Sequence, residues 1–155
     1  VSFDYASKPN PFSDGRALVT NDRMQAGYLD KEGNMALEFK YTQNSFGFHN
    51  GYALVTLDVP ELTKVIIDVN GKLVRKLETN NEPYVNVDGR IVYEPKTQDG
   101  LQVLNPDGTV LIGNAMYSKI LGFADNRAYV EFYKDGANQS GFINPKGELV
   151  IVRKD

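Results

Sequence analysis

The 155-residue sequence contains no cysteine and no tryptophan, and its single histidine is His49. The absence of cysteine excludes disulfides, thiolate nucleophiles and cysteine-based zinc sites. A single histidine excludes metal sites built from histidine clusters and confines any Ser-His-acid arrangement to the neighbourhood of His49, where no nucleophile-elbow pattern occurs. Because His49 precedes Asn50-Gly51, we interpret it as an exposed turn residue. We expect no catalytic residues and no enzyme activity.

Two further absences concern membranes and nucleic acids. No apolar run approaches the length of a membrane span, and Val1–Tyr5 lacks the basic region and apolar stretch of a signal peptide. The net charge is −3 and charges of both signs are scattered, so no basic stripe matches a phosphate backbone. With 41% apolar and 24% charged residues, the composition is typical of a globular protein. We therefore expect one soluble domain over residues 1–155, without nucleic acid as a partner and without membrane insertion.

A four-residue turn recurs along the chain. It begins with Asp or Asn, whose side chain can accept a hydrogen bond from the backbone two residues on, and it ends with Gly. Its copies are Asp30-Lys31-Glu32-Gly33, Asp68-Val69-Asn70-Gly71, Asn105-Pro106-Asp107-Gly108 and Asn144-Pro145-Lys146-Gly147. Glycine in last place predicts a positive φ, as in a type I turn followed by a bulge. The glycines at 33, 71, 108 and 147 are 38, 37 and 39 residues apart.

A second turn recurs between these, with nearly the same period. Its copies are Ser13-Asp14-Gly15, His49-Asn50-Gly51, Val87-Asp88-Gly89 and Ala124-Asp125-Asn126. Asp-Gly, Asn-Gly and Asp-Asn tolerate the positive φ angles of tight hairpins. Two independent markers with one period indicate about four tandem copies of roughly 37 residues.

Short apolar segments rich in Val, Ile, Tyr and Phe lie between the turns and predict strands rather than helices. Three segments per copy give roughly a dozen strands, so we predict an all-β fold of tandem antiparallel β-hairpin repeats. The copies are expected to form a propeller-like or barrel-like roll, with an open β-repeat stack as the alternative. Ala17, Ala53, Ile91 and Ala128 share one repeat position and are interpreted as packing residues.

No motif in the sequence indicates a metal or a cofactor. Asp68-Val69-Asn70-Gly71 resembles the start of a calcium loop, but the further acidic ligands do not follow, and turn chemistry already explains these residues. No glycine-rich phosphate loop occurs. A pair of carboxylates for glycoside hydrolysis stays open, because two strands can bring distant acids together. We expect no cofactor and no metal, and the sequence leaves the ligand-binding residues unknown.

Nine tyrosines and eight phenylalanines are the remaining clue. Those at repeat positions are expected in the core, namely Phe3, Phe12, Phe39, Phe48, Tyr117 and Phe123. The less regular Tyr84, Tyr93 and Tyr133 are candidates for an exposed face, and tyrosine-rich surfaces suit protein contacts. Sugar-binding surfaces commonly also use Trp, so its absence counts against carbohydrate.

The repeat resembles the bacterial WG-repeat, or KWG-repeat, family. In that pattern an aromatic residue precedes a Gly-led apolar strand, which is followed by Gly-aromatic-Ile-Asp and a turn ending in Gly. The first copy follows it as Phe12, Gly15–Val19, Gly27–Asp30 and Gly33, and the last as Phe123, Arg127–Val130, Gly141–Asn144 and Gly147. Where the family has Trp-Gly, this sequence has Ala26-Gly27, Lys64-Val65, Leu101-Gln102 and Ser140-Gly141.

The resemblance implies a bacterial repeat protein, often exported or attached to the cell surface, and usually without known enzymatic activity. Repeat proteins present broad binding surfaces, so we expect a non-catalytic binding or surface-display module whose partner is another protein. A carbohydrate or cell-wall binding module is the first alternative. A hydrolase with an unrecognised carboxylate site is the second.

The N-terminal segment resembles the closing part of a repeat, because Phe3, Tyr5, Phe12 and Gly15 align with Phe39, Tyr41, Phe48 and Gly51 at an offset of 36. We predict that residues 1–11 complete the last copy beside Leu149–Val152 and cover its open edge. Deleting residues 1–11 should then lower the melting temperature by about ten degrees or more, since two buried aromatics are lost. An unchanged melting temperature in differential scanning calorimetry would contradict this closure.

Overall fold

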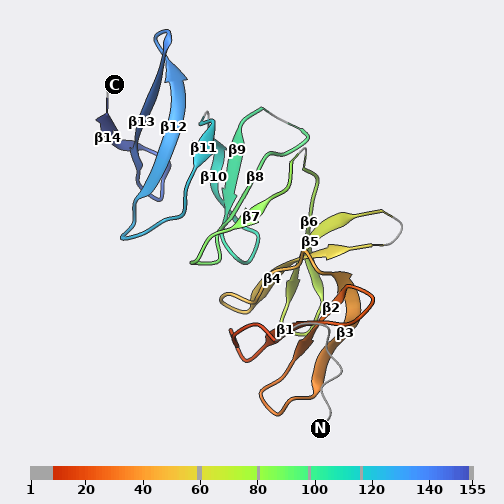
Figure 1. The fold of residues 1–155 in the computed structure, drawn as a ribbon. Helices are drawn as coiled ribbons and strands as arrows, with labels where there is room; N and C mark the ends of the chain where they lie inside the picture. The colour runs from red at the N-terminus through yellow and green to blue at the C-terminus, as the bar shows by residue number, and fades with distance from the viewer. Residues whose placement is uncertain (1–8, 59–60, 80, 98, 116, 154–155) are drawn as a thin grey trace. The chain divides into compact units, whose positions relative to one another are not determined.

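The computed structural model describes residues 9–58, 61–79, 81–97, 99–115 and 117–153. These residues form fourteen β-strands and no helix, and every strand pair is antiparallel (Figure 1). The predicted all-β fold of antiparallel hairpins is therefore confirmed. The chain groups into two compact units, Val1–Leu77 with Pro106–Gly108, and Glu78–Asn105 with Thr109–Asp155.

The first unit contains one six-stranded sheet in which the strands follow chain order. It holds the first two copies, which meet where Tyr41 of β3 pairs with Leu57 of β4. Its strands are β1 (Ala17–Thr20), β2 (Gln25–Leu29), β3 (Met35–Thr42), β4 (Tyr52–Leu57), β5 (Thr63–Asp68) and β6 (Leu73–Leu77). Their buried side chains form one cluster that contains Tyr28, Tyr41 and Phe48.

The second unit contains two four-stranded sheets. One has the order β10-β9-β8-β7 and the other the order β11-β12-β13-β14. The first consists of β7 (Tyr84–Val85), β8 (Ile91–Tyr93), β9 (Leu101–Leu104) and β10 (Val110–Ala115), and the second of β11 (Lys119–Ile120), β12 (Ala128–Lys134), β13 (Ala137–Ile143) and β14 (Leu149–Arg153). One core cluster, which includes Val92, Ile112, Phe123 and Phe132, joins the two sheets.

The turn chemistry predicted from the sequence is confirmed. Gly33, Gly71, Gly108 and Gly147 have φ angles of 85°, 78°, 82° and 83°. Asp30, Asp68 and Asn144 cap the turns that they begin, as when Asp68 Oδ1 accepts hydrogen bonds from the backbone N–H groups of Asn70 and Lys72. In the second kind of turn, both central residues of Asp14-Gly15, Asn50-Gly51 and Asp125-Asn126 have positive φ, as a tight hairpin requires.

Each copy also carries a β-bulge that the sequence did not reveal. In the first copy Leu29 pairs with Met35 and Tyr28 with Leu37, so that Ala36 is the extra residue. The equivalent extra residues in the later copies are Val74, Leu111 and Val150. All four lie three residues after the turn glycine. A bulge changes the face of the sheet to which the next side chain points. It therefore sets the direction of the side chain four residues after each turn glycine.

That side chain contacts the turn of the next copy. A Cβ placed on Gly71 would lie 3.0 Å from Leu37 Cδ2, and one placed on Gly147 would lie 3.1 Å from Ile112 Cγ2. Within the first unit, a Cβ on Gly108 would lie 3.3 Å from Arg75 Cδ. The carbonyl oxygen of Gly108 also accepts a hydrogen bond of 2.6 Å from Arg75 Nη1. The turn of one copy therefore packs against the outer strand of the copy before it.

Phe12 was predicted to lie in the core, but its side chain is 52% exposed, because it stands in the segment before the first hairpin and not in a sheet. Phe48 and Phe123 are buried as predicted, as are Ala17, Ala53, Ile91 and Ala128. The predicted packing of Phe3 and Tyr5 lies outside the described residues. None of the three sheets formed by the described residues closes on itself, and a closed roll remains a prediction.

Gly141 is needed for the close approach of β14 to β13. A Cβ there would lie 2.3 Å from the carbonyl oxygen of Ile151, and backbone cannot easily move away. We expect Gly141→Ala to lower the free energy of unfolding by about 1–3 kcal/mol. Gly47 is the control, because a Cβ there meets nothing within 4 Å, so Gly47→Ala should be neutral or slightly stabilising. Equal urea midpoints for the two variants would refute this account of Gly141.

Candidate functional site

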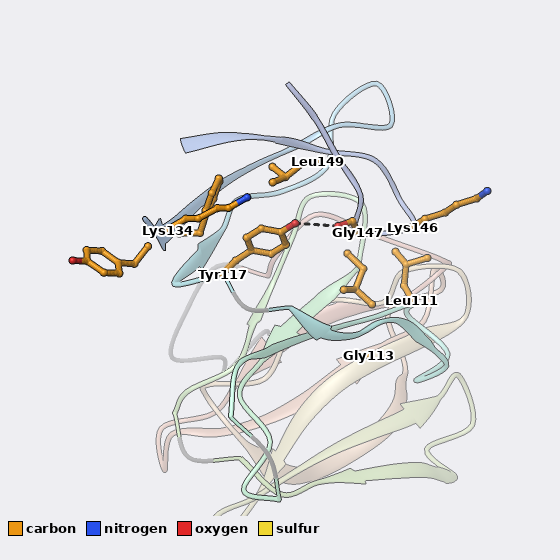
Figure 2. A pocket seen from close by; sticks show the side chains of 10 residues that line it. Leu111, Gly113, Tyr117, Lys134, Lys146, Gly147 and Leu149 are labelled. Atoms are coloured by element: carbon orange, nitrogen blue, oxygen red, sulfur yellow. Dashed lines mark hydrogen bonds between the residues drawn. The ribbon is translucent and has the colours of Figure 1, made fainter. Parts of the chain in front are cut away.

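A hollow with a volume of about 500 Å³ lies within the second unit. Ten residues from β10, β12, β14 and the adjoining turns line it, and Figure 2 shows them from close by. They are Leu111, Ile112, Gly113, Tyr117, Phe132, Tyr133, Lys134, Lys146, Gly147 and Leu149. The hollow thus forms where the outer strand of the third copy meets the turn and outer strand of the fourth.

Tyr117 holds the two copies together beside this hollow. Its hydroxyl donates a hydrogen bond of 3.0 Å to the carbonyl oxygen of Gly147, and its ring packs edge-on against Phe132 at 5.8 Å between centroids. Figure 2 shows the ring between Lys134 and Gly147, while Lys146 extends away from the hollow. Burial raises the pKa of the Tyr117 hydroxyl. The phenol therefore stays protonated at neutral pH and acts as a hydrogen-bond donor.

The alternation of β12 determines which side chains reach the solvent. Phe132 points into the core, whereas its neighbour Tyr133 is 70% exposed, as expected when successive side chains point to opposite faces. Lys134 follows at the end of the strand, and Lys146 comes from the last repeat turn. None of the ten described lining residues carries a carboxylate. The hollow therefore combines apolar and aromatic side chains with positive charge.

A smaller hollow of about 300 Å³ in the same unit is more polar. Its lining residues are Ser118, Tyr129, Glu131, Phe132, Asn138, Gln139 and Ser140. Its hydroxyl, amide and carboxylate groups can form hydrogen bonds with a sugar, and its aromatic ring can stack on the sugar ring. Glu131 is also held by an ion pair of 3.3 Å with Lys119.

The candidate residues for chemistry do not come together. His49 lies half-buried in the turn that its backbone closes with Tyr52, at 2.8 and 3.1 Å. The Asp68 carboxylate accepts hydrogen bonds from its own turn, as turn chemistry predicted. No three His, Asp or Glu side chains of the described part of the chain are grouped as a metal ion would require. Among those residues there is also no helix of sufficient length and apolarity to cross a membrane.

The predicted exposed tyrosines are only partly confirmed. Tyr84 and Tyr133 are exposed, but the prediction for Tyr93 is wrong. Tyr93 is buried in β8, with its hydroxyl 2.8 Å from Gln102 Oε1 on the paired strand. Gln102 supplies the polar partner that makes this burial favourable. Sequence reasoning missed Lys134 and Leu149 as lining residues, because only the packing of two copies places them together.

The sequence comparison identifies one family. Residues 27–58 match the family model of the WG-containing repeat. The resemblance is thereby confirmed over the segment from β2 to the end of β4. The match begins at Gly27, where a Cβ would lie 2.8 Å from the carbonyl oxygen of Leu37. The glycine of the WG pair is thus required by the close approach of β3.

The Trp position of that pair is inward-facing in this chain. Ala26 and Ser140 are buried there, and so is Lys64, whose ammonium group donates a hydrogen bond of 2.8 Å to Thr56 Oγ1. The equivalent Leu101 packs against the core of the second unit. Smaller or flexible side chains therefore occupy the place that an indole takes in the family pattern.

The comparisons with whole proteins concern the fold alone. No curated protein matches the sequence. The structure is similar to BamB from Moraxella catarrhalis, with a TM-score of 0.51 and 15% identity over 91% of this chain and 47% of that one. A protein of unknown function from Bacteroides caccae matches with a TM-score of 0.39 and 14% identity, over 94% of this chain and 59% of that one. The chain thus spans about half the length of these structures.

Two buried tyrosines in the first unit differ in their hydrogen bonding. Tyr28 donates a hydrogen bond of 2.6 Å to the carbonyl oxygen of Phe46. The buried hydroxyl of Tyr41 has no hydrogen-bond partner among the described residues. The rings are 5.9 Å apart and pack edge-on. Burial raises the pKa of Tyr41 to about 12. The pKa of Tyr28 is also raised, mainly by burial and to a smaller extent by the charge of Tyr41.

This difference predicts opposite effects of removing the two hydroxyls. Tyr28→Phe should cost about 0.5–1.5 kcal/mol of unfolding free energy, whereas Tyr41→Phe should be neutral or stabilising. A raised pKa in the folded state stabilises the fold below the unfolded value of 10.0, and this contribution is lost as the pH rises toward about 12. Urea unfolding should therefore show that the unfolding free energy falls less between neutral and alkaline pH in Tyr41→Phe than in the wild type. If Tyr41→Phe lost more unfolding free energy at neutral pH than Tyr28→Phe, this account of the two hydroxyls would be wrong.

Proposed function

We propose that this chain is a non-catalytic module that binds another protein through the 500 Å³ hollow of its second unit. The observation that carries the proposal is the lining of that hollow. It contains the exposed Tyr133, several apolar side chains and two lysines, and none of the described lining residues carries a carboxylate. Tyrosine combines a large apolar ring with a polar hydroxyl, and such residues dominate many protein interfaces. Lysines at the rim favour a partner segment that carries acidic side chains next to apolar ones.

The wider surface around the hollow supports the same proposal. The successive side chains Leu149–Val152 of β14 are exposed, and Leu149 lines the hollow. Contiguous exposed apolar surface on a globular protein commonly marks an interaction site. The match to the WG-containing repeat adds the expectation of a bacterial exported or cell-surface protein. Closure of the copies into one propeller-like or barrel-like domain over residues 1–155 is part of this proposal, and it rests on the repeated contact between successive copies.

Carbohydrate binding is the second candidate, and the polar hollow around Tyr129, Asn138 and Gln139 favours it. An aromatic face beside amide and hydroxyl groups suits a sugar ring. Hydrolysis has weaker support, because Asp30 and Asp68 cap their own turns and Glu131 forms an ion pair with Lys119.

The test is affinity capture from a bacterial extract with the intact chain and two variants, Tyr133→Ala and Lys134→Glu. If the hollow binds a protein, each variant should reduce recovery of that protein about tenfold or more, which corresponds to 1.4 kcal/mol or more of binding energy. The matched controls are Leu62→Ala, which changes a side chain that is 68% exposed, and Lys72→Glu, both in the first unit. They should recover the partner as the wild type does.

Two outcomes would refute the protein-binding proposal. One is equal recovery with Tyr133→Ala, Lys134→Glu and the wild type. The other is capture of no protein together with binding on a glycan array that Gln139→Ala abolishes and Tyr133→Ala leaves intact. That second pattern would establish the carbohydrate alternative.

A further inference from the structure

The 500 Å³ hollow of the second unit lies along the edge of a strand. Phe132, Tyr133 and Lys134 are successive residues of β12, and all three line it. Successive side chains of a strand point to opposite faces of the sheet, so three in a row can line one hollow only where it borders the edge of the strand. The hollow therefore meets the backbone of β12 as well as its side chains.

This part of the edge has no neighbouring strand among the described residues. β11 pairs with β12 only at Val130 and Glu131. Just before β11, the backbone N–H of Ser118 still donates a hydrogen bond of 2.9 Å to the carbonyl oxygen of Glu131. The described chain makes no further backbone hydrogen bond to this edge beyond Glu131. The gap lies in the interior of the chain and follows from the shortness of β11, which has two residues.

The backbone groups of Tyr133 point into this gap. In an antiparallel strand, every second residue directs its N–H and C=O groups to the same side. Tyr129 directs them toward β11, since its carbonyl oxygen accepts a hydrogen bond of 2.9 Å from the N–H of Leu121. Glu131 does the same, and Tyr133 is the next residue in this series. Lys134 belongs to the other series and pairs with β13 across the tight turn. The Tyr133 N–H and carbonyl oxygen thus have no partner among the described residues.

We propose that the partner of the hollow is an extended acidic peptide segment, which adds to the edge of β12 and pairs with the backbone of Tyr133. Lys134 and Lys146 supply positive charge, and none of the described lining residues carries a carboxylate. Acidic side chains of the segment therefore meet opposite charge, while its apolar side chains contact Leu111 and Leu149. This inference rests on the proposed protein-binding function and names the class of its partner.

A second copy of β12 is a poorer occupant of the same edge. Pairing of two β12 strands about a two-fold axis would bring the Lys134 side chains of the two molecules near each other. Like charges close together on paired strands are destabilising. Lysine on an exposed edge is a common means of preventing such self-pairing. The charge of this edge thus favours an acidic segment over a copy of the chain itself.

The probe for a test is a short fluorescein-labelled peptide of alternating glutamate and valine, with binding to the intact chain measured by fluorescence anisotropy. One control peptide has lysine in place of glutamate. Another keeps the side chains but carries a methyl group on every backbone nitrogen, which removes the N–H donors. Both controls should bind about tenfold more weakly or worse, because one has the wrong charge and the other cannot complete the ladder.

Two variants of Tyr133 separate backbone from side chain. Tyr133→Pro removes the edge N–H, and proline is tolerated on an edge where that N–H faces away from the ladder. Tyr133→Ala removes only the side chain. Tyr133→Pro should bind the glutamate peptide about tenfold more weakly than Tyr133→Ala does, with an unchanged circular dichroism spectrum. The double variant Lys134→Glu with Lys146→Glu should prefer the lysine peptide instead.

Amide hydrogen exchange gives a measurement on the unmodified chain. The Tyr133 amide should exchange rapidly in the free chain and slowly with the glutamate peptide bound. The Lys134 amide is the matched control, because it is bonded to β13 and should exchange slowly in both samples.

Any of three results would overturn the inference. They are absence of binding of the glutamate peptide at millimolar concentration, equal binding of its methylated form, and a Tyr133 amide that is already protected in the free chain. The proposed function would survive these results if recovery of a protein partner still depended on the Tyr133 and Lys134 side chains. Loss of that dependence would instead refute the proposed function itself.

Discussion

The approach of each turn glycine to the strand of the preceding copy is the contact on which the array depends. At Gly71, Gly108 and Gly147 a Cβ would come within 3.0–3.1 Å of a side chain in the copy before. Glycine serves two needs at this position, because it adopts the positive φ of the turn and lets the neighbouring strand come close. The bulge three residues later supplies the other half of the contact, since it directs Leu37, Arg75 or Ile112 toward the next turn.

The same contact explains where the hollow of the second unit arises. Packing of the fourth turn against the third outer strand joins Leu111, Tyr117 and Gly147 in one place and leaves a hollow between the copies. The hollow forms through this packing and needs no particular sequence motif within a single copy. Variation at strand ends, such as Tyr133-Lys134 at the end of β12, then decides what the hollow presents to a partner. In the proposed function, binding depends on the side chains at the junctions between copies, while the turns hold those junctions in place.

Substitution of the family's Trp shows how the hairpins tolerate change. Gly27 and Gly141 are retained because the adjacent strand passes within contact distance of their backbone. The preceding residue is less constrained, and Ala26, Lys64 and Ser140 all fit the same inward-facing position. Lys64 donates a hydrogen bond to Thr56 Oγ1 there. Close backbone approach thus requires glycine at positions 27 and 141, whereas Val65 and Gln102 stand at the same place in the second and third copies.

Local chemistry in the sequence determined the turns, the strand segments and the period of about 37 residues. An Asp or Asn followed by Gly has few ways to turn, and alternating apolar residues between turns have few ways to be buried. The bulges could not be foreseen, because the extra residues Ala36, Val74, Leu111 and Val150 are apolar like their strand neighbours and carry no turn signal. The exposure of Phe12 and the burial of Tyr93 were likewise decided by long-range pairing, with Gln102 as the partner of Tyr93. The hollow was determined only by tertiary structure, because its lining residues come from strands and turns that meet when one copy packs on another.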